Sequence, residues 1–183
     1  MTERLSVDAA VRLEEVFSGI AATRMADLPI LNPALGVAAV GFRAWRGGSC
    51  GILITPWFMN LILLPGPPSL GRDDLHAEIG DLPSGTRLTI ALPSGDYDFL
   101  AAREDSLGPY LSCSLFSPMS QFVDMDGARA VAAAAILQLF AEPPAAAQVP
   151  ADLSGRLAQP VSRRGFLAAL LPGPLSHPDK PSS

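Results

Sequence analysis

Residues 50–65 read CGILITPWFMNLILLP and form the most apolar part of the chain. Residues 50–55 carry apolar side chains at consecutive positions, which predicts a strand that is buried on both faces. Pro56 interrupts this strand because it has no backbone N–H for a sheet ladder, and residues 57–65 resume as a second extended run. The broken run is shorter than the roughly 20 residues of a membrane-spanning helix, so we expect no stable membrane insertion.

Further strands are predicted on both sides of this block. The alternation in residues 86–92 places Leu88 and Ile90 on one face, and the one in residues 110–116 does the same for Leu111 and Cys113. With short links between them, about six strands favour an antiparallel sheet. The remaining predicted strands and turns are residues 37–45, a turn at 46–49, and a turn with the start of a strand at 93–100.

Two helices complete the predicted fold. The first follows a cap at Ser6 or Asp8, presents an apolar face through Leu13 and Phe17, and ends by about Asp27. The second is the Ala-rich stretch 128–141, capped by Asp126. The prediction is an α+β fold, a single domain with a mainly antiparallel β-sheet packed by both helices. We place this domain at residues 8–142 and a mobile, Pro/Ala-rich tail at residues 143–183.

Charge and composition exclude several classes of function. The chain has 183 residues and a net charge of −5, which argues against a general affinity for nucleic acid. The tail carries four basic and two acidic residues, hence +2, which leaves −7 for residues 1–142. The first eight residues of the chain include Glu3 and Asp8 and lack an apolar segment. We therefore expect no secretory signal and a cytoplasmic location.

The sequence lacks the usual groupings of catalytic or metal-binding residues. It has neither a GxSxG nucleophile motif nor a phosphate-binding glycine loop, and its two histidines, His76 and His177, are isolated. Cys50 and Cys113 belong to no CxxC pair and are predicted to be buried. The spacing of the acidic residues around His76 matches no EF-hand loop. These residues are Asp73, Asp74, Glu78 and Asp81. From all these absences we expect no metal, no cofactor and no enzymatic activity.

The segment Trp57, Phe58, Met59 and Asn60 has two interpretations. It can be a plain core strand, in which Asn60 bonds to backbone beside the break at Pro56. It can also be an apolar surface for a client peptide, since aromatic and methionine side chains repack readily around a bound segment. An amide buried in such a run needs hydrogen-bond partners, because an unsatisfied polar group costs about 1–3 kcal/mol.

Four stretches of the chain resemble the HybE family of nickel–iron hydrogenase assembly chaperones, which includes HupJ and HoxT proteins. They are MADLPILNPALGVAAVGFRAW (25–45), GILITPWFMNLILLPG (51–66), GPYLSCSLFSPMSQFVD (108–124) and the terminal SRRGFL (162–167). The resemblance implies a cytoplasmic, non-enzymatic maturation factor. Its implied partners are the hydrogenase small-subunit precursor, which carries a twin-arginine signal, the large subunit and other accessory proteins. It further implies that the chaperone delays export of the precursor. A scaffold that joins these proteins without recognising the signal is the alternative.

The terminal motif itself resembles a twin-arginine signal and comprises Ser162, Arg163, Arg164, Phe166 and Leu167. Three explanations stay open: chance similarity, a docking helix for another assembly factor, or a mimic of the client's signal. Arginines of a signal or of its mimic would pair with carboxylates of the acidic domain. The candidates are one group of Asp96, Asp98, Glu104 and Asp105, or the pair Asp124 and Asp126.

Overall fold

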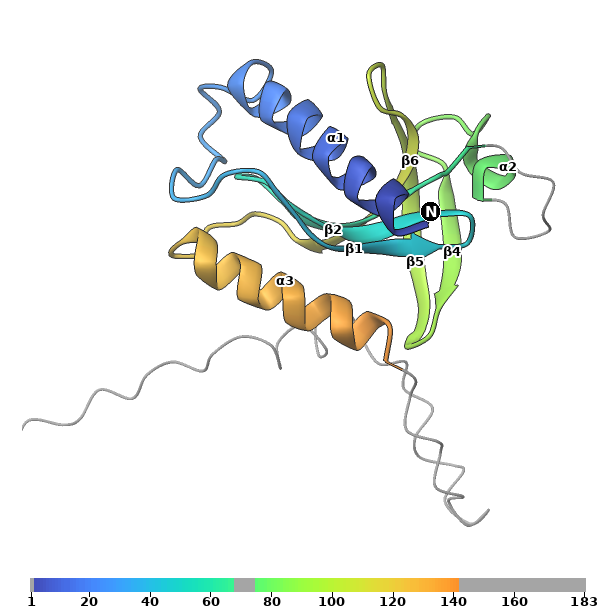
Figure 1. Ribbon diagram of the computed structural model, residues 1–183. Coiled ribbons are helices and arrows are strands. Elements are labelled where there is room, and N and C mark those ends of the chain that lie inside the picture. The colour runs from blue at the N-terminus through green and yellow to red at the C-terminus, as the bar shows by residue number, and fades with distance from the viewer. Residues whose placement is uncertain (1, 68–74, 142–183) are drawn as a thin grey trace, which may run out of the picture. The chain divides into compact units, whose positions relative to one another are not determined.

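The computed structural model describes residues 2–67 and 75–141 (Figure 1). Within them, helices and strands follow the order predicted from the sequence pattern, with one additional short helix, α2. Their bounds are α1 Thr2–Ala22, β1 Ala38–Trp45, β2 Gly48–Ile54, β3 Met59–Leu64, α2 Leu75–Ile79, β4 Arg87–Leu92, β5 Gly95–Glu104, β6 Gly108–Phe116 and α3 Met125–Leu139.

The strands form one antiparallel sheet with the order β1-β2-β3-β6-β5-β4. The apolar block therefore provides β2 and β3, which lie inside the sheet between β1 and β6. Ile52 pairs with Leu61, and Ile54 pairs with Met59. Because β2 and β3 each have a neighbour on both sides, every backbone group in them can join a ladder, which suits their continuous burial.

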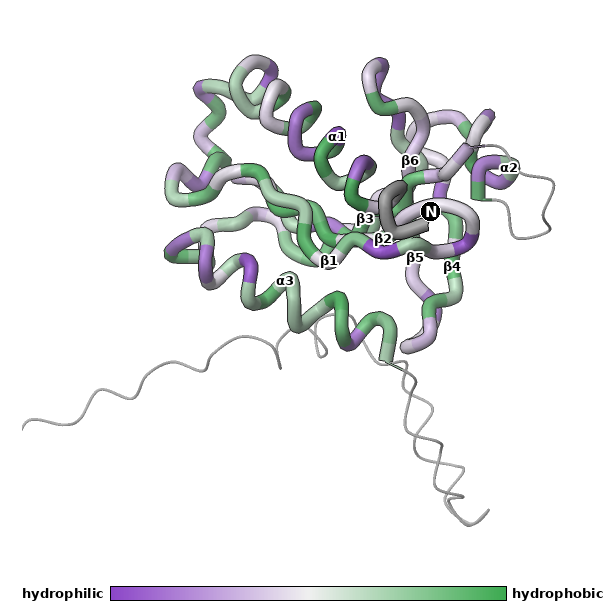
Figure 2. The backbone as a smooth tube through the Cα atoms, viewed as in Figure 1, coloured by the Kyte–Doolittle hydropathy of each residue, from purple (hydrophilic) through white to green (hydrophobic). Residues whose placement is uncertain are grey.

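The two long helices cover opposite faces of the sheet (Figure 1). α1 packs over β1 and β2 through Leu13 and Phe17, which join a cluster with Leu53 and Ile62. α3 lies under β1 and β2 with a stripe of small and aliphatic side chains. In Figure 2 the central strands are mostly in the hydrophobic colour, as expected for a layer between two helices. The buried residues of α3 are Ala128, Val131, Ala132, Ala135, Ile136 and Leu139.

A glycine allows α3 to approach the edge of the sheet closely. Gly41 lies at a register shift in β1 with φ of +66°, a conformation that side chains rarely adopt. A Cβ atom at this position would lie 2.7 Å from the Ile136 Cγ2 atom of α3. The close contact between helix and sheet therefore requires glycine here.

Several local predictions were wrong in detail. α1 begins at Thr2, before the predicted caps Ser6 and Asp8. The cap of α3 is Asp124 and not Asp126, because the Asp124 carboxylate accepts the N–H of Gly127 at 2.8 Å. Asp126 instead lies in the first turn of the helix, where it complements the helix dipole.

The second extended run also starts later than predicted, at Met59. Thr55 explains this difference, because its Oγ1 atom accepts the N–H of Phe58 at 3.0 Å while its own N–H donates to the Phe58 carbonyl at 2.8 Å. These bonds close a tight turn that contains Pro56, Trp57 and Phe58. The two aromatic residues thus belong to a turn and not to the strand.

Candidate functional site

Three loops meet at one end of the sheet. Ala38 of β1 pairs with Ile54 of β2, Ile54 pairs with Met59 of β3, and Met59 pairs with Phe116 of β6. The loops that leave this row are residues 23–37, 55–58 and 117–124, and we call them together the loop pole. Three of the four stretches that carry the family resemblance run through these loops.

Asn32 holds the loops of the loop pole together. Its side-chain Nδ2 group donates to the carbonyls of Met119 at 3.0 Å and Phe122 at 2.7 Å, and its backbone N–H donates to the Pro56 carbonyl at 2.9 Å. Its Oδ1 atom accepts the N–H of Ala34 at 3.0 Å. One residue thereby fixes segments that lie more than 80 positions apart, which gives the loop pole a defined shape.

An open groove of about 450 Å³ lies between two of these loops. It is mainly apolar, and Asn32, whose bonds join the two loops, is one of its lining residues. Hydrophobic side chains near it are unusually exposed, with Ile30 at 54% and Val123 at 87%. The groove is lined by Pro29, Ile30, Leu31, Asn32, Pro33, Pro118, Ser120 and Phe122. Such exposed apolar surface in a concave site is typical of a binding site for another molecule.

Exposed carboxylates adjoin the groove in the chain. Asp27 precedes the lining segment 29–33, and Asp124 follows the lining residue Phe122 by two positions. Asp126 lies one residue into α3. Since the cap bond to Gly127 uses only one Asp124 oxygen, its second oxygen remains able to accept from a cation. The segments that line the apolar groove are thus flanked in the chain by exposed carboxylates.

The predicted client surface at residues 57–60 is divided by the structure. Trp57 and Phe58 are half-buried, with their rings edge-to-face at 5.5 Å, and Phe58 also contacts Phe17 at 5.8 Å. Met59 is fully buried, so its predicted exposure to a client is wrong. The reason is that Met59 is the first residue of β3 and its side chain packs into the core, whereas Phe58 belongs to the preceding turn.

The core interpretation predicted that Asn60 bonds to backbone at the Pro56 break. The structure shows a different partner. The Asn60 Nδ2 group donates to the Ser112 hydroxyl of β6 at 2.8 Å. Its Oδ1 atom is buried without a hydrogen-bond partner. Asn60 therefore links β3 to β6 across the sheet and leaves one amide atom unsatisfied.

The four carboxylates of β5 and its turn do not form a single group. Asp96 and Asp98 lie near the first end of β5, whereas Glu104 ends the strand and Asp105 follows it. Asp98 and Glu104 are six positions apart, which is about 20 Å at the rise of a strand.

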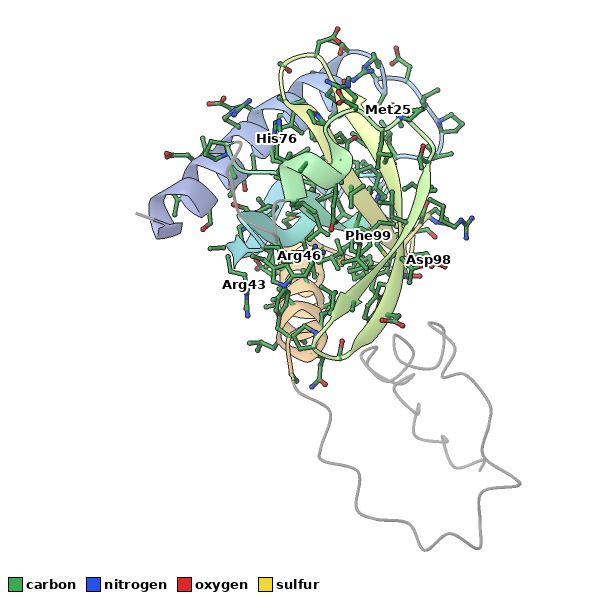
Figure 3. All side chains as sticks on the ribbon, turned by 90° about the vertical axis from the view of Figure 1, so that its right-hand side faces the viewer. Met25, Arg43, Arg46, His76, Asp98 and Phe99 are labelled. Carbon is green, nitrogen blue, oxygen red and sulfur yellow. The ribbon has the colours of Figure 1, made fainter. Side chains whose placement is uncertain are left out.

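Two of these carboxylates already have partners. Asp98 accepts from Thr89 at 2.9 Å and lies 3.8 Å from Arg87, and Glu104 pairs at 2.6 Å with Arg24, which follows α1 in the loop 23–37. Figure 3 shows Asp98 on the outside and its neighbour Phe99 among the interior side chains. The structure thus offers two separate acidic sites at the ends of β5. The one at Glu104 contacts the loop pole through its ion pair with Arg24, whereas Asp96 and Asp98 lie at the other end of the strand.

The remaining sequence-predicted residues give no site within the described ranges. Residues 2–67 and 75–141 contain no cluster of three metal-ligating side chains and no helix that is long and apolar enough to cross a membrane. His76 lies in α2. The terminal motif 162–167, His177, and Asp73 and Asp74 lie outside the described residues.

Both cysteines are buried in the sheet, as predicted. Burial raises the pKa of the Cys50 thiol from 9.0 to about 12, and the nearby Arg43 guanidinium opposes this only in part. A buried thiol with so high a pKa is a poor nucleophile at neutral pH. Cys50 is thus a core residue.

Sequence reasoning missed the groove and its organiser, Asn32. The signal that could have found them is the spacing of prolines, with Pro29 and Pro33 bracketing Asn32 and Pro118 in the partner loop. Prolines fix the course of a loop without secondary structure. What the pattern could not provide is the pairing of these two loops, which lie about 85 residues apart.

Known proteins resemble this chain along most of its length. A family model described as NiFe-hydrogenase assembly, chaperone, HybE matches residues 8–169. The chain is 45% identical over 168 residues to Protein HoxT of Cupriavidus necator, covering 88% of each chain. It is 44% identical over 147 residues to hydrogenase expression/formation protein HupJ of Bradyrhizobium diazoefficiens, covering 80% of this chain and 79% of HupJ.

A solved structure supports the fold. The solution structure of HybE from Escherichia coli aligns with a TM-score of 0.57 and 27% sequence identity, over 82% of this chain and 87% of HybE. The antiparallel sheet with its helices is thereby confirmed as the fold class that the sequence predicted. On the match of sequence and structure together, the chain belongs to the HybE family of nickel–iron hydrogenase assembly chaperones.

Proposed function

We propose that the protein is a non-enzymatic, cytoplasmic chaperone that binds the small-subunit precursor of an uptake nickel–iron hydrogenase. It holds the precursor near its twin-arginine signal and delays export until assembly is complete. Family membership supports hydrogenase assembly as the process. The observation that carries the finer proposal is the open apolar groove of the loop pole, whose lining segments are flanked in the chain by the exposed carboxylates of Asp27, Asp124 and Asp126.

The chemistry of a twin-arginine signal matches this site. Such a signal presents two guanidinium groups followed by apolar residues. The apolar residues would occupy the groove beside Ile30 and Phe122, and the guanidinium groups would pair with Asp124 and Asp126. We favour this pair over the carboxylates of β5 because Asp124 follows a groove-lining residue in the chain. Trp57 and Phe58, in the turn of the same pole, would extend the apolar surface.

Capture of the precursor with and without its signal peptide tests the proposal. The immobilised full-length chain is expected to retain the complete precursor and to lose most of it when the signal is removed. Ile30→Asp places a carboxylate in the apolar groove and is expected to weaken signal-dependent capture by roughly tenfold or more. Leu137→Asp is the matched control, because Leu137 is 65% exposed on α3, outside the loop pole, and its replacement should leave capture unchanged.

A second variant tests the flanking carboxylates. Asn caps helices as well as Asp does, so Asp124→Asn with Asp126→Asn removes two charges and preserves the cap of α3. Signal-dependent capture is expected to fall and to become less sensitive to salt. Equal capture of the precursor with and without its signal would reject the proposal in favour of a scaffold that joins hydrogenase subunits and accessory proteins.

The terminal motif 162–167 enters the same assay. If the motif mimics the client signal, truncation after Gln159 should raise the affinity for a signal peptide. If it is a docking arm, truncation should leave that affinity unchanged and abolish binding of another assembly protein. A truncated chain that matches the full chain in both measurements would identify the motif as chance similarity.

A further inference from the structure

The two edges of the sheet differ in how they are protected. β1 is one edge, and there the Glu14 carboxylate of α1 accepts the outward N–H of Ala39 at 2.7 Å. The register shift between Val40 and Arg43 disrupts the same edge further. Bulges and covering side chains are the usual means by which proteins prevent edge strands from pairing with other chains.

β4 is the other edge (Figure 1). Residues 85 and 86 both bond to Ala101, with Gly85 at φ of +90°, so a bulge lies just before this strand and not within it. Its pairing with β5 runs without a register shift from Arg87 to Leu92. The Thr86 carbonyl accepts the N–H of Ala101 at 2.8 Å, so residue 86 faces β5. Because the bonding direction alternates along a strand, the backbone groups of Arg87, Thr89 and Ala91 point away from the sheet.

These outward groups are open among the described residues. No hydrogen bond within residues 2–67 and 75–141 reaches the N–H groups of Arg87, Thr89 or Ala91. The side chains of all three residues are exposed. An ordered strand of six residues with free backbone donors and acceptors is a template for another strand.

We propose that a second copy of this chain pairs with this edge, so that two β4 strands join antiparallel about a two-fold axis at Thr89. This register places Thr89 opposite Thr89 of the other copy, and Arg87 opposite Ala91. All three outward N–H groups and all three outward carbonyls of each copy then have partners. A two-fold contact needs a self-complementary surface, and this strand meets that requirement in its backbone.

The side chains of β4 are also self-complementary in this register. On one face, Arg87 would reach across the small Ala91 of the partner strand to the carboxylate of Asp96, which pairs with Ala91 in the β4–β5 ladder. Arg87 is free to do so, because its 3.8 Å contact with its own Asp98 is loose and its side chain is 71% exposed. On the other face, Leu88 would lie opposite Ile90; Leu88 is half-buried and Ile90 is buried in its own core, so Leu88 provides the apolar contact on this face.

The contact is short, which determines how strong it can be. Pairing of two six-residue strands buries less than the roughly 1,000 Å² of a stable interface. Association is therefore expected to be reversible and to depend on protein concentration. It does not depend on the proposed client site, because β4 contributes no residue to the loop pole.

Sedimentation equilibrium of the full-length chain between about 10 μM and 1 mM measures this association. The wild type is expected to shift from monomer towards dimer. Thr89→Pro removes an outward N–H without touching the ladder to β5, and should remain monomeric. Thr89→Val is the matched control, because it also loses the hydroxyl bond to Asp98 but keeps the N–H, and should dimerise like the wild type.

A charge exchange tests the register. Arg87→Asp is expected to weaken dimerisation by roughly tenfold, and addition of Asp96→Arg should restore it, since the opposite charges then face each other again. A wild type that is monomeric at every concentration would overturn the proposal. A dimer that Thr89→Pro and Arg87→Asp leave intact would also overturn it, because another surface would then hold the copies together.

Amide hydrogen exchange of the wild type keeps the proposal testable if Thr89→Pro does not fold. Exchange at Arg87, Thr89 and Ala91 should slow as protein concentration rises. The amides of Leu88 and Ile90, which already bond to β5, should not change. Slow exchange at the three outward amides at all concentrations would show that another part of the same chain occupies the edge, which would contradict pairing of two copies.

Discussion

Asn60 shows how a single polar residue is accommodated in an apolar strand. β3 has the sequence MNLILL, and its one amide is satisfied at Nδ2 by Ser112 and unsatisfied at Oδ1. A buried polar atom without a partner costs about 1–3 kcal/mol, so this site is a local weakness in the sheet. The strand tolerates it because the remaining five side chains are buried and apolar.

We predict that removal of the Ser112 hydroxyl destabilises the protein, while removal of both polar groups does not. Ser112→Ala leaves the entire Asn60 amide without a partner and should lower the free energy of unfolding by about 1–3 kcal/mol. Asn60→Val combined with Ser112→Ala should regain this loss. Urea denaturation of the two variants measures the difference. A double variant that is less stable than Ser112→Ala would show that Asn60 makes a further favourable contact.

At the scale of elements, α3 depends on how its first turn is closed. The sequence pattern located this helix correctly but selected Asp126 as the cap. The observed cap is Asp124, which has extended backbone dihedrals and bonds to Gly127. A cap is defined by the backbone of the residue before the helix, and a run of two aspartates within three positions does not determine which of them has that backbone.

We predict that Asp124→Ala lowers stability by about 1 kcal/mol, the usual cost of a lost N-cap. Asp126→Ala should cost only a few tenths of a kcal/mol, because Asp126 contributes through the helix dipole at an exposed position. Thermal unfolding followed by circular dichroism compares the two variants. Equal losses would mean that the cap bond to Gly127 contributes no more than the charge of the first turn.

At the scale of the whole molecule, burial in the sheet raises the pKa of two ionisable groups, Tyr110 and Cys50. Burial raises the pKa of the Tyr110 hydroxyl from 10.0 to about 12, and the nearby Glu104 carboxylate adds to this, while Arg24 opposes it. Burial raises the pKa of the Cys50 thiol to a similar value. Both groups ionise at lower pH in the unfolded chain than in the folded protein, so ionisation favours unfolding.

We predict that stability is complete below about pH 9 and declines as the pH rises towards 12. Tyr110→Phe should reduce the decline above about pH 10, because the variant no longer has a buried hydroxyl to ionise. Urea midpoints at several alkaline pH values measure this effect, with Tyr97→Phe as the matched control. A decline in Tyr110→Phe as steep as in Tyr97→Phe would assign the alkaline transition to other groups.

Much of the molecule follows from local pattern alone. The two-sided apolar run at residues 50–65, the alternation in residues 86–92 and 110–116, and the small-residue helix at 128–141 each predict their element correctly. The reason is that burial on a sheet or helix face has a period of its own, which can be read in the order of side chains. The family membership also followed from the chain itself, through the stretches at 25–45, 51–66 and 108–124.

The site was decided only by tertiary structure. Asn32 gains its role because strand pairing brings residues 29–33 against residues 118–122, and no local pattern encodes that meeting. Met59 is buried because it is part of a strand inside the sheet. Asp98 and Glu104 are close in the sequence, but they lie near opposite ends of the extended strand β5. The period of a sequence pattern shows on which face of a helix or strand a side chain lies. Contacts between loops depend instead on strand order and register, which are set by the packing of the whole sheet.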